Sequence, residues 1–315
     1  MRILVTGGHG FLGRFLVAHL RSTGHEVHVL GHSARPNSLT ADLRGTVPDL
    51  PHGSYDEVYH LAGKAHVVPR TPSDAQDFHA VNYHGTQNLL AGIDRLASVP
   101  QSFVLASTVA VYGQDSGEYL TEDTPREAAD PYGLSKRLAE DAVFEWGDSR
   151  GVRITIVRLP LVVGPGAPGN LRSIIDAINL GRYAGIGKGD ARRSMVLAVD
   201  VATALPALSA IGGVYHLTDG YHPSLSEIAN AIARTLNRPQ PPRIPQLLGH
   251  MIGRVGDLLS RVIDSERIPT SPMIRKLTST LTFDDSRARG CIGWSPTPVL
   301  MDVHNWCTVT TRTTS

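Results

Sequence analysis

The chain has 315 residues and carries 30 lysines and arginines against 29 aspartates and glutamates, which leaves a formal net charge of +1. The sequence has no basic stripe and no apolar run near the ~20 residues of a membrane-spanning helix. We therefore expect neither a nucleic-acid nor a membrane partner. Only two cysteines, Cys291 and Cys307, occur, which argues against a disulfide scaffold and fits a cytoplasmic protein, and the cysteines and histidines lack metal-site spacing.

The first predicted elements are a strand, a glycine-rich turn and a helix. An apolar run over residues 3–5 stops at glycines 7, 8, 10 and 13, and an amphipathic segment over 11–20 follows. These glycines fit two overlapping spacings of the dinucleotide-binding turn, in which the backbone approaches a pyrophosphate at a helix N-terminus. An ordinary strand-to-helix turn is the alternative interpretation of this motif alone.

Further strands and helices alternate along the first half of the chain. Their spacing predicts an α/β fold with a doubly wound parallel sheet. The predicted strands cover 25–30, 57–61, 102–106 and 153–159, and the predicted helices cover 82–97 and 132–146.

Ligands of such a sheet bind outside the carboxyl ends of its strands. Gly7, His60, Thr108 and Arg158 are expected near such ends. These positions therefore mark the edge of the sheet where we expect a binding site.

The character of the chain changes beyond residue 165, where prolines cluster and short helices alternate with loops. We predict a dinucleotide-binding domain over 1–165, completed by a strand near 213–218. A smaller, mainly substrate-binding region is expected over 166–307. The threonine-rich tail, 308–315, is expected to be disordered.

The segment Tyr132-Gly133-Leu134-Ser135-Lys136 lies on a predicted helix. Positions i and i+4 share a helix face, so Tyr132 and Lys136 project together. A nearby ammonium favours the phenolate, which makes the tyrosine a usable proton donor and acceptor near neutral pH. The alternative is a surface tyrosine beside a lysine, since this spacing is common.

Several other motifs accompany the Tyr132–Lys136 pair. They are Thr6-Gly7-x-x-Gly10-x-x-Gly13, His60-Leu61-Ala62-Gly63, Val81-Asn82-x-x-Gly85-Thr86, Ser107-Thr108-x-x-Val111-Tyr112-Gly113, and Arg158 with Gly164-Pro165-Gly166. Together they resemble the extended short-chain dehydrogenase/reductase family, specifically its nucleotide-sugar epimerases, dehydratases and ketoreductases. The resemblance extends over residues 1–306 and implies the Rossmann type of sheet.

The resemblance also implies roles for individual residues. Tyr132 would be the catalytic acid/base, Lys136 would also hold the nicotinamide ribose, and Thr108 would hydrogen-bond the reacting oxygen. Other residues would line the dinucleotide site: Gly7, Gly10, Phe11, Leu12, Asp42, Leu43, Leu61, Ala62 and Gly63.

The substrate half carries further points of similarity. Asn170 resembles the asparagine that meets a sugar-nucleotide diphosphate, and Arg193 resembles the arginine that pairs with it. Leu161 departs from the family, because several members have an asparagine at this position. The resemblance further implies a homodimer formed through the helices 82–97 and 132–146.

The segment after the second strand also departs from the family pattern. Many members have an aspartate there for the adenosine ribose, whereas this chain continues as Leu30-Gly31-His32-Ser33-Ala34-Arg35. A carboxylate repels a 2′-phosphate and an arginine binds it. We therefore favour NADP(H), with Arg35 and Ser33 as ligands, over NAD. A mobile loop side chain is the alternative for Arg35.

Two functions at C4 of a nucleotide sugar follow from the resemblance. The first is a 4-ketoreductase acting on a UDP-4-keto-6-deoxy-(N-acetyl)hexosamine, and the second is a UDP-sugar 4-epimerase that retains NAD. A 4,6-dehydratase is disfavoured because Val109-Ala110 replaces the acidic pair that it needs. A non-sugar ketone reductase and a non-catalytic NADP-binding regulator remain as alternatives.

Overall fold

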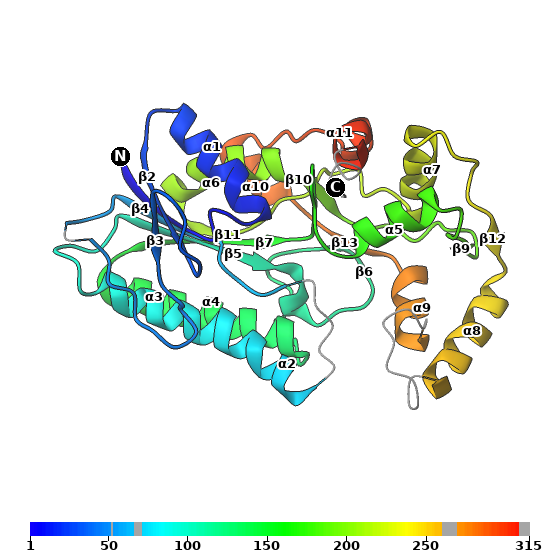
Figure 1. The fold of residues 1–315 in the computed structure, drawn as a ribbon, viewed down its shortest axis with the longest axis horizontal. Coiled ribbons are helices and arrows are strands. Elements are labelled where there is room, and N and C mark those ends of the chain that lie inside the picture. The colour runs from blue at the N-terminus through cyan, green and yellow to red at the C-terminus, as the bar shows by residue number, and fades with distance from the viewer. Residues whose placement is uncertain (52, 66–70, 260–269, 309–315) are drawn as a thin grey trace.

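The computed structural model describes residues 1–51, 53–65, 71–259 and 270–308. Within these residues a seven-stranded sheet forms the centre, and each neighbouring pair of its strands runs parallel. Helices cover both faces of the sheet, which gives three layers (Figure 1). This doubly wound α/β architecture is the one predicted from the alternation of strands and helices.

The strands of the sheet follow the order β11-β7-β5-β4-β1-β2-β3. The chain starts in the middle, runs outward through β2 and β3, and then crosses to β4 on the other side of β1. This reversal of direction lies between β1 and β4, which is where doubly wound sheets bind dinucleotides. The bounds are β1 Arg2–Thr6, β2 Glu26–Gly31, β3 Ser38–Thr40, β4 Glu57–His60, β5 Ser102–Thr108, β7 Arg153–Leu159 and β11 Gly213–His216.

Two groups of helices flank the sheet. Helices α1, α6 and α10 lie on one face, and α3 and α4 lie on the other (Figure 1). The bounds are α1 Phe11–Ser22, α2 Pro72–Phe78, α3 Gly85–Ile93, α4 Pro131–Arg150, α6 Ala198–Ile211 and α10 Ser286–Ile292.

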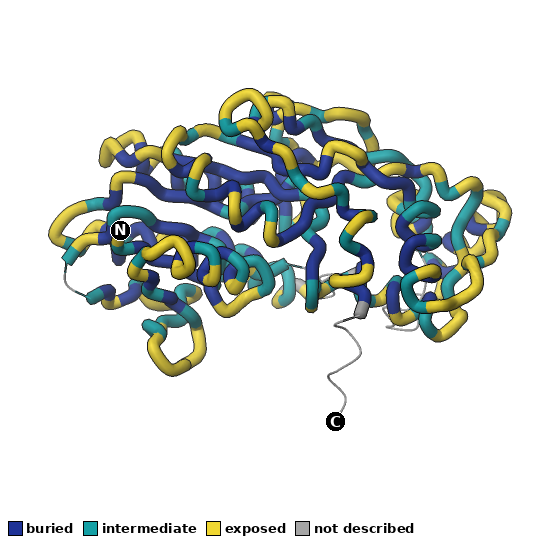
Figure 2. The backbone as a smooth tube through the Cα atoms, turned by 90° about the horizontal axis from the view of Figure 1, so that it is seen from above, coloured by how far each residue is buried: buried dark blue, intermediate teal, exposed yellow. Residues whose placement is uncertain are grey.

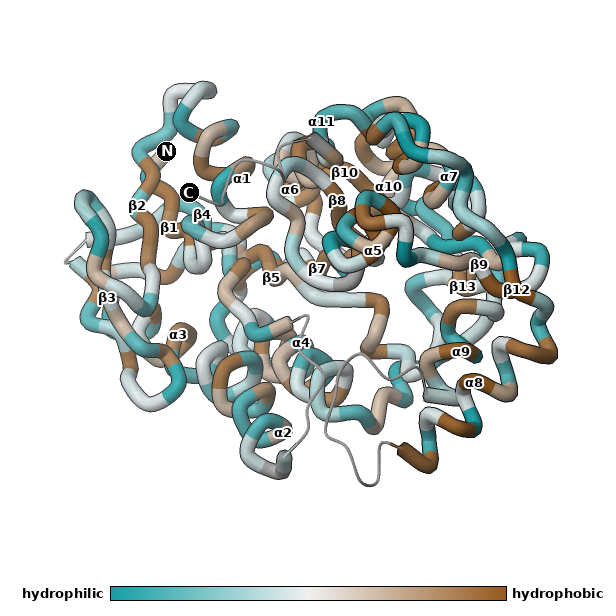
Figure 3. Tube along the Cα trace, turned by 45° about the vertical axis from the view of Figure 1, so that its right-hand side comes forward, coloured by the Kyte–Doolittle hydropathy of each residue, from teal (hydrophilic) through white to brown (hydrophobic). Residues whose placement is uncertain are grey.

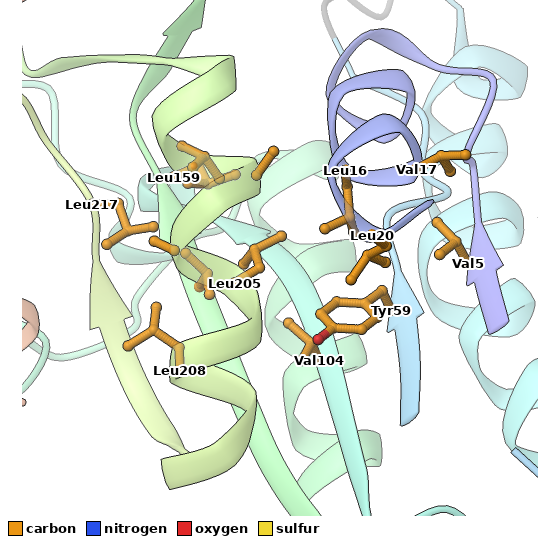
Figure 4. Close-up of a cluster of buried hydrophobic side chains, with 14 of the residues drawn as sticks. Val5, Leu16, Val17, Leu20, Tyr59, Val104, Leu159, Leu205, Leu208 and Leu217 are labelled. Atoms are coloured by element: carbon orange, nitrogen blue, oxygen red, sulfur yellow. The ribbon is translucent and has the colours of Figure 1, made fainter. Parts of the chain in front are cut away.

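The hydrophobic core lies between the sheet and these helices. Leu16 and Leu20, one helical turn apart on α1, face Tyr59 and Val104 of the sheet, and Leu205 of α6 packs into the same cluster (Figure 4). Burying each leucine contributes about 1.5–3 kcal/mol relative to leaving it exposed. Most of the central strands are accordingly buried, as the dark blue segments of Figure 2 show.

Helix α4 holds the Tyr132–Lys136 motif and is longer than expected. It starts at Pro131, after Asp130 caps it by accepting a hydrogen bond from the Gly133 amide at 3.0 Å. It ends at Arg150 because Gly151 adopts a left-handed conformation with φ 66°.

The helix predicted over 82–97 is only partly correct. A π-helical turn, His79–His84, precedes α3, and regular helix ends at Ile93. The buried Asn82 side chain in this turn donates to the Lys64 carbonyl oxygen at 3.1 Å and to the Ser135 hydroxyl at 2.9 Å. The sequence prediction missed this wider turn because it relied on a 3.6-residue hydrophobic period, whereas the turn is built around a polar side chain.

The second half of the chain adds small sheets and helices beside the main sheet. Three two-stranded pairs form: β8 with β10, β9 with β12, and β13 with β6, a strand of the first half. The strand bounds are β6 Gly117–Leu120, β8 Leu161–Val163, β9 Gly185–Ile186, β10 Met195–Leu197, β12 Arg243–Ile244 and β13 Leu281–Phe283. The helix bounds are α5 Asn170–Asn179, α7 Leu225–Thr235, α8 Gln246–Leu259, α9 Ser271–Thr278 and α11 Val303–Thr308.

The described residues form neither a bilayer-crossing helix nor a metal-binding cluster. None of their helices combines the length and apolar character that crossing requires. No group of three or more histidine, cysteine, aspartate or glutamate side chains in this part of the chain could hold a metal ion.

Candidate active site

The glycine turn after β1 brings the backbone close to a second loop. Gly7 has φ 68°, and a Cβ at this position would lie only 2.6 Å from the Ala62 amide nitrogen. Helix α1 begins directly after Gly10 without a side-chain cap. The first amides of α1 are therefore open to an anion, and the turn fits the pyrophosphate of a dinucleotide.

A buried hydrogen-bond chain fixes the loop that faces this turn. The Thr86 hydroxyl donates to the Asn82 carbonyl oxygen at 2.6 Å, so it accepts from His60 Nε2 at 2.9 Å. His60 Nδ1 then accepts from the Thr6 hydroxyl at 2.6 Å, and Thr6 Oγ1 accepts from the Ala62 amide at 3.2 Å. The chain joins β1, β4 and α3, and it positions Leu61, Ala62 and Gly63. Burial lowers the pKa of His60 to about 3, which keeps the imidazole neutral.

Thr108 and Tyr132 come together at the carboxyl end of β5. Thr108 is the last residue of that strand, and Tyr132 lies in the first turn of α4. Burial raises the pKa of the Tyr132 phenol, a hydrogen bond with Thr108 lowers it, and the Asp130 carboxylate raises it. The net direction is upward, and the lowering expected from Lys136 stays a prediction. The phenol is protonated at neutral pH and can donate a proton.

Lys136 projects from the same face of α4 into the protein. Its ammonium donates to the Ala106 carbonyl oxygen at 2.6 Å. Burial lowers the pKa of Lys136 to about 8, and the Glu140 carboxylate opposes this by raising it. A side chain at Gly63 would come within 3.8 Å of Lys136 Nζ, so the ammonium faces the loop between β4 and α2.

Sequence reasoning missed Glu140, which lies one turn beyond Lys136 on α4. Its carboxylate is fully buried and accepts from Arg158 Nη2 at 2.8 Å and from Arg126 Nη1 at 3.2 Å. The Ser107 hydroxyl also donates to Glu140. The sequence signal that could have identified Glu140 is its position four residues after Lys136, on the same helix face.

Ser107 and Thr108 therefore face in different directions, because alternate residues of a strand point to opposite sides. Ser107 is bound to Glu140 beneath the site, whereas Thr108 interacts with Tyr132. The role of Thr108 in meeting the reacting oxygen stays a prediction.

The segment after β2 holds the residues predicted to select the cofactor. Ser33 and Arg35 are exposed. Asp42 is engaged by Arg44, which donates to it at 2.7 Å and lowers its pKa. Leu43 accepts a hydrogen bond from Asn88 Nδ2 at 2.8 Å through its carbonyl oxygen.

Sequence reasoning also missed His9 of the glycine turn. His9 Nε2 lies 2.8 Å from Ser38 Oγ, at hydrogen-bond distance, so the turn and β3 are joined beside Arg35. Only the fold reveals this contact, because the two residues are distant in sequence.

The proposed diphosphate residues lie in the second half of the chain. Arg193 is partly buried, which lowers its pKa, and its guanidinium donates to the carbonyl oxygens of Lys276 and Ser279 at the end of α9. It is thus more than a solvated loop arginine. Asn170 starts α5, but its side chain lies outside the described residues. No described contact joins Arg193 to Tyr132.

A profile of the NAD dependent epimerase/dehydratase family matches residues 3–212. The chain belongs to this family. It is therefore an NAD(P)-dependent enzyme of the extended short-chain dehydrogenase/reductase type, as the sequence motifs indicated.

Its curated relatives include both epimerases and reductases. It is 24% identical over 321 residues to a UDP-glucose 4-epimerase of Vibrio cholerae, covering 95% of this chain and 92% of that protein. It is 28% identical over 246 residues to a GDP-6-deoxy-D-mannose reductase of Pseudomonas aeruginosa, covering 74% and 79%.

Solved structures share the fold of this family member. MoeE5 in complex with UDP-glucose and NAD aligns with a TM-score of 0.75 at 22% identity and covers 100% of both chains. RMD from Pseudomonas aeruginosa complexed with NADPH aligns with a TM-score of 0.69 at 24% identity and covers 98% of both chains. Proteins of this fold therefore hold either cofactor.

Proposed function

We propose that this protein reduces the C4 keto group of a UDP-4-keto-6-deoxy-(N-acetyl)hexosamine with NADPH. The observation that carries the proposal is the joint placement of Tyr132, Thr108 and Lys136 at the carboxyl end of β5. Its relatives at 24% and 28% identity are an epimerase and a reductase of nucleotide sugars.

The nicotinamide cofactor, when bound, supplies the hydride. Gly7 and the open start of α1 would hold its pyrophosphate, and Lys136 would hold the ribose next to the nicotinamide. Thr108 orients the substrate by hydrogen-bonding the C4 oxygen. Tyr132 then donates its proton to that oxygen as the alcohol forms.

In this proposal Arg193 and Asn170 bind the diphosphate of the substrate. Arg193 retains donors beyond those used on α9, since a guanidinium carries five N–H groups. A non-sugar ketone reductase has no need of this cation. A non-catalytic regulator has no need of Thr108, Tyr132 and Lys136 in one place.

Cofactor selectivity tests the reductase against the epimerase. Arg35 is exposed beside Ser38, and residues 32–41 directly after β2 contain no carboxylate. NADPH should therefore bind about tenfold or more tightly than NADH through a charge-assisted contact with the 2′-phosphate. Titration of the cofactor-free protein with both reduced cofactors measures this preference. Arg35→Ala should remove most of it, whereas Arg21→Ala at the far end of α1 should not.

Turnover of a UDP-4-keto-6-deoxy sugar with oxidation of NADPH is the matching activity assay. The epimerase is the second candidate, favoured by the Vibrio cholerae relative. Stoichiometric NAD⁺ in the purified protein, with interconversion of UDP-hexoses and no added cofactor, would establish the epimerase instead. The homodimer through the helices at 82–97 and 132–146 stays a prediction, as do the domain bounds at 165 and 307.

A further inference from the structure

The carboxyl end of β2 is surrounded by polar groups from three separate segments. Figure 3 shows the brown, hydrophobic strand β2 beside β1, with β3 at the margin of the molecule. The chain leaves β2 at Gly31. His9 reaches this place from the glycine turn, and its Nε2 lies 2.8 Å from Ser38 Oγ of β3. A Cβ at Gly31 would lie 3.6 Å from His9 Cδ2 and 3.9 Å from the Ser33 carbonyl oxygen.

A tight turn adds Arg35 to these groups. The Ser38 amide donates to the Arg35 carbonyl oxygen at 3.2 Å. Asn37, inside the turn, adopts a left-handed conformation with φ 57°, which asparagine tolerates better than most residues. Arg35 is therefore one hydrogen bond away from the residue that His9 contacts. We name these four residues the β2-end cluster: His9, Ser33, Arg35 and Ser38.

The contact between His9 and Ser38 leaves one hydrogen-bond donor unused. If the Ser38 hydroxyl donates to His9 Nε2, the neutral imidazole carries its proton on Nδ1. If the hydroxyl accepts from Nε2 instead, its own proton is left over. Within the described part of the chain, neither His9 Nδ1 nor Ser38 Oγ has a further hydrogen-bond partner. Either tautomer therefore presents one N–H or O–H group to a ligand that accepts hydrogen bonds.

The charges around the β2-end cluster favour an anion. Arg35 and His32 are exposed, and residues 32–41 contain no carboxylate. The next acid along the chain, Asp42, is already engaged by Arg44, whose Nη2 donates to it at 2.7 Å. An anion at the cluster therefore meets a guanidinium and a free donor without facing an unpaired carboxylate from this segment.

The place of the cluster in the sheet indicates which anion it binds. In a doubly wound sheet the dinucleotide pyrophosphate lies at the start of the first helix, and the adenosine ribose lies near the end of the second strand. We propose that His9 and Ser38 bind the 2′-phosphate of NADP(H) together with Arg35, so that the glycine turn and β3 share in selecting the cofactor. This inference rests on the proposed use of NADPH and extends it to two residues that the sequence motifs did not indicate.

Titration of the cofactor-free protein tests the inference without any turnover. Two pairs of ligands differ in the 2′-phosphate: NADPH with NADH, and 2′,5′-ADP with AMP. His9→Ala and Ser38→Ala should each reduce the affinity ratio within both pairs by about threefold or more, because each removes a hydrogen bond to a charged group. His84→Ala and Ser22→Ala, at exposed positions elsewhere, are the matched controls and should leave both ratios unchanged.

Two results would overturn the inference and leave the proposed reductase in place. The first is that both variants retain the original affinity ratios while Arg35→Ala removes them, which would assign the 2′-phosphate to Arg35 alone. The second is an equal loss of NADPH and NADH affinity, which would mean that His9 and Ser38 only support the glycine turn. An original protein without any preference for NADPH would instead contradict the proposed cofactor itself, and the inference with it. Equal thermal unfolding midpoints of the variants and the original protein show that folding is intact.

Discussion

Tyr132 is the residue to which the proposed chemistry is most sensitive. Tyr132→Phe keeps the aromatic ring beside Phe78, whose ring centroid is 5.7 Å away, and removes only the proton donor. Loss of general acid catalysis should lower kcat by about 10²–10⁴-fold, with the dissociation constant of the cofactor little changed. Steady-state kinetics and cofactor titration check this, with Tyr83→Phe as a control. Near-full turnover by Tyr132→Phe would remove this residue from the mechanism.

Glu140 provides the negative charge nearest to Lys136 on α4. Glu140→Gln removes a carboxylate that raises the pKa of Lys136 and leaves the buried Arg158 without its partner. The pKa of Lys136 should therefore fall below its value of about 8, and the alkaline limb of the kcat/KM profile should move to lower pH. The same substitution should destabilise the protein by about 3–5 kcal/mol.

The exposed Glu145 of α4 supplies a matched control. Glu145→Gln should change neither the pH profile nor the unfolding midpoint. A pH profile of Glu140→Gln that coincides with that of the original enzyme would show that Glu140 supports only the fold. Measuring the rate of Lys136 acetylation against pH gives its pKa without any substrate.

At the level of elements, Arg193 connects the loop before β10 to the end of α9. Its guanidinium binds the carbonyl oxygens of Lys276 and Ser279. Arg193→Ala should weaken UDP binding by about one to two powers of ten if it also holds the diphosphate, because charge-assisted hydrogen bonds contribute about 1.5–3 kcal/mol. Calorimetry with UDP measures this, with the exposed neighbour Arg192→Ala as control. Unchanged UDP affinity would restrict Arg193 to holding α9.

The elements that the sequence predicted best are those with strong local signals. Strand β1 contains an apolar run over residues 3–5, β7 is rich in isoleucine, valine and leucine, and α1 follows its glycine turn directly. Strand β3 was missed, because Ser38–Thr40 is short and lacks a buried residue. The pairing of β6 with β13 depends on contacts over more than 150 residues, which a local pattern does not encode.

In the candidate site, too, residues with local sequence signals were predicted and residues that depend on distant contacts were missed. The motifs identified Thr108, Tyr132 and Lys136, and the structure places them at one strand end. Glu140 was missed because its importance arises from Arg158, a residue of a different element. The distinct directions of Ser107 and Thr108 also became clear only once β5 was paired on both sides.

For the whole molecule, two buried histidines of the central sheet contribute to the response to acid. His60 of β4 and His216 of β11 are 1% and 0% exposed. Burial lowers the pKa of His60 to about 3 and that of His216 to about 4. His216 Nδ1 donates to the Asp284 carbonyl oxygen at 2.9 Å, and its Nε2 accepts from the Tyr112 hydroxyl at 2.6 Å. Burial therefore keeps both rings neutral, although the hydrogen bond to the Asp284 carbonyl opposes this for His216.

These pKa values give the stability a definite dependence on pH. In the unfolded chain a histidine has a pKa of about 6.5, so below that pH the unfolded state binds protons that the folded state excludes. Stability is complete above pH 6.5 and falls as the pH drops toward 4, by about 2 kcal/mol per histidine at pH 5. Denaturant unfolding at pH 7 and pH 5 measures the loss. His60→Gln should be less stable at pH 7 yet lose less on acidification, whereas the exposed His84→Gln should behave like the original protein. An equal acid loss in His60→Gln and the original protein would mean that His60 is not neutral in the folded state.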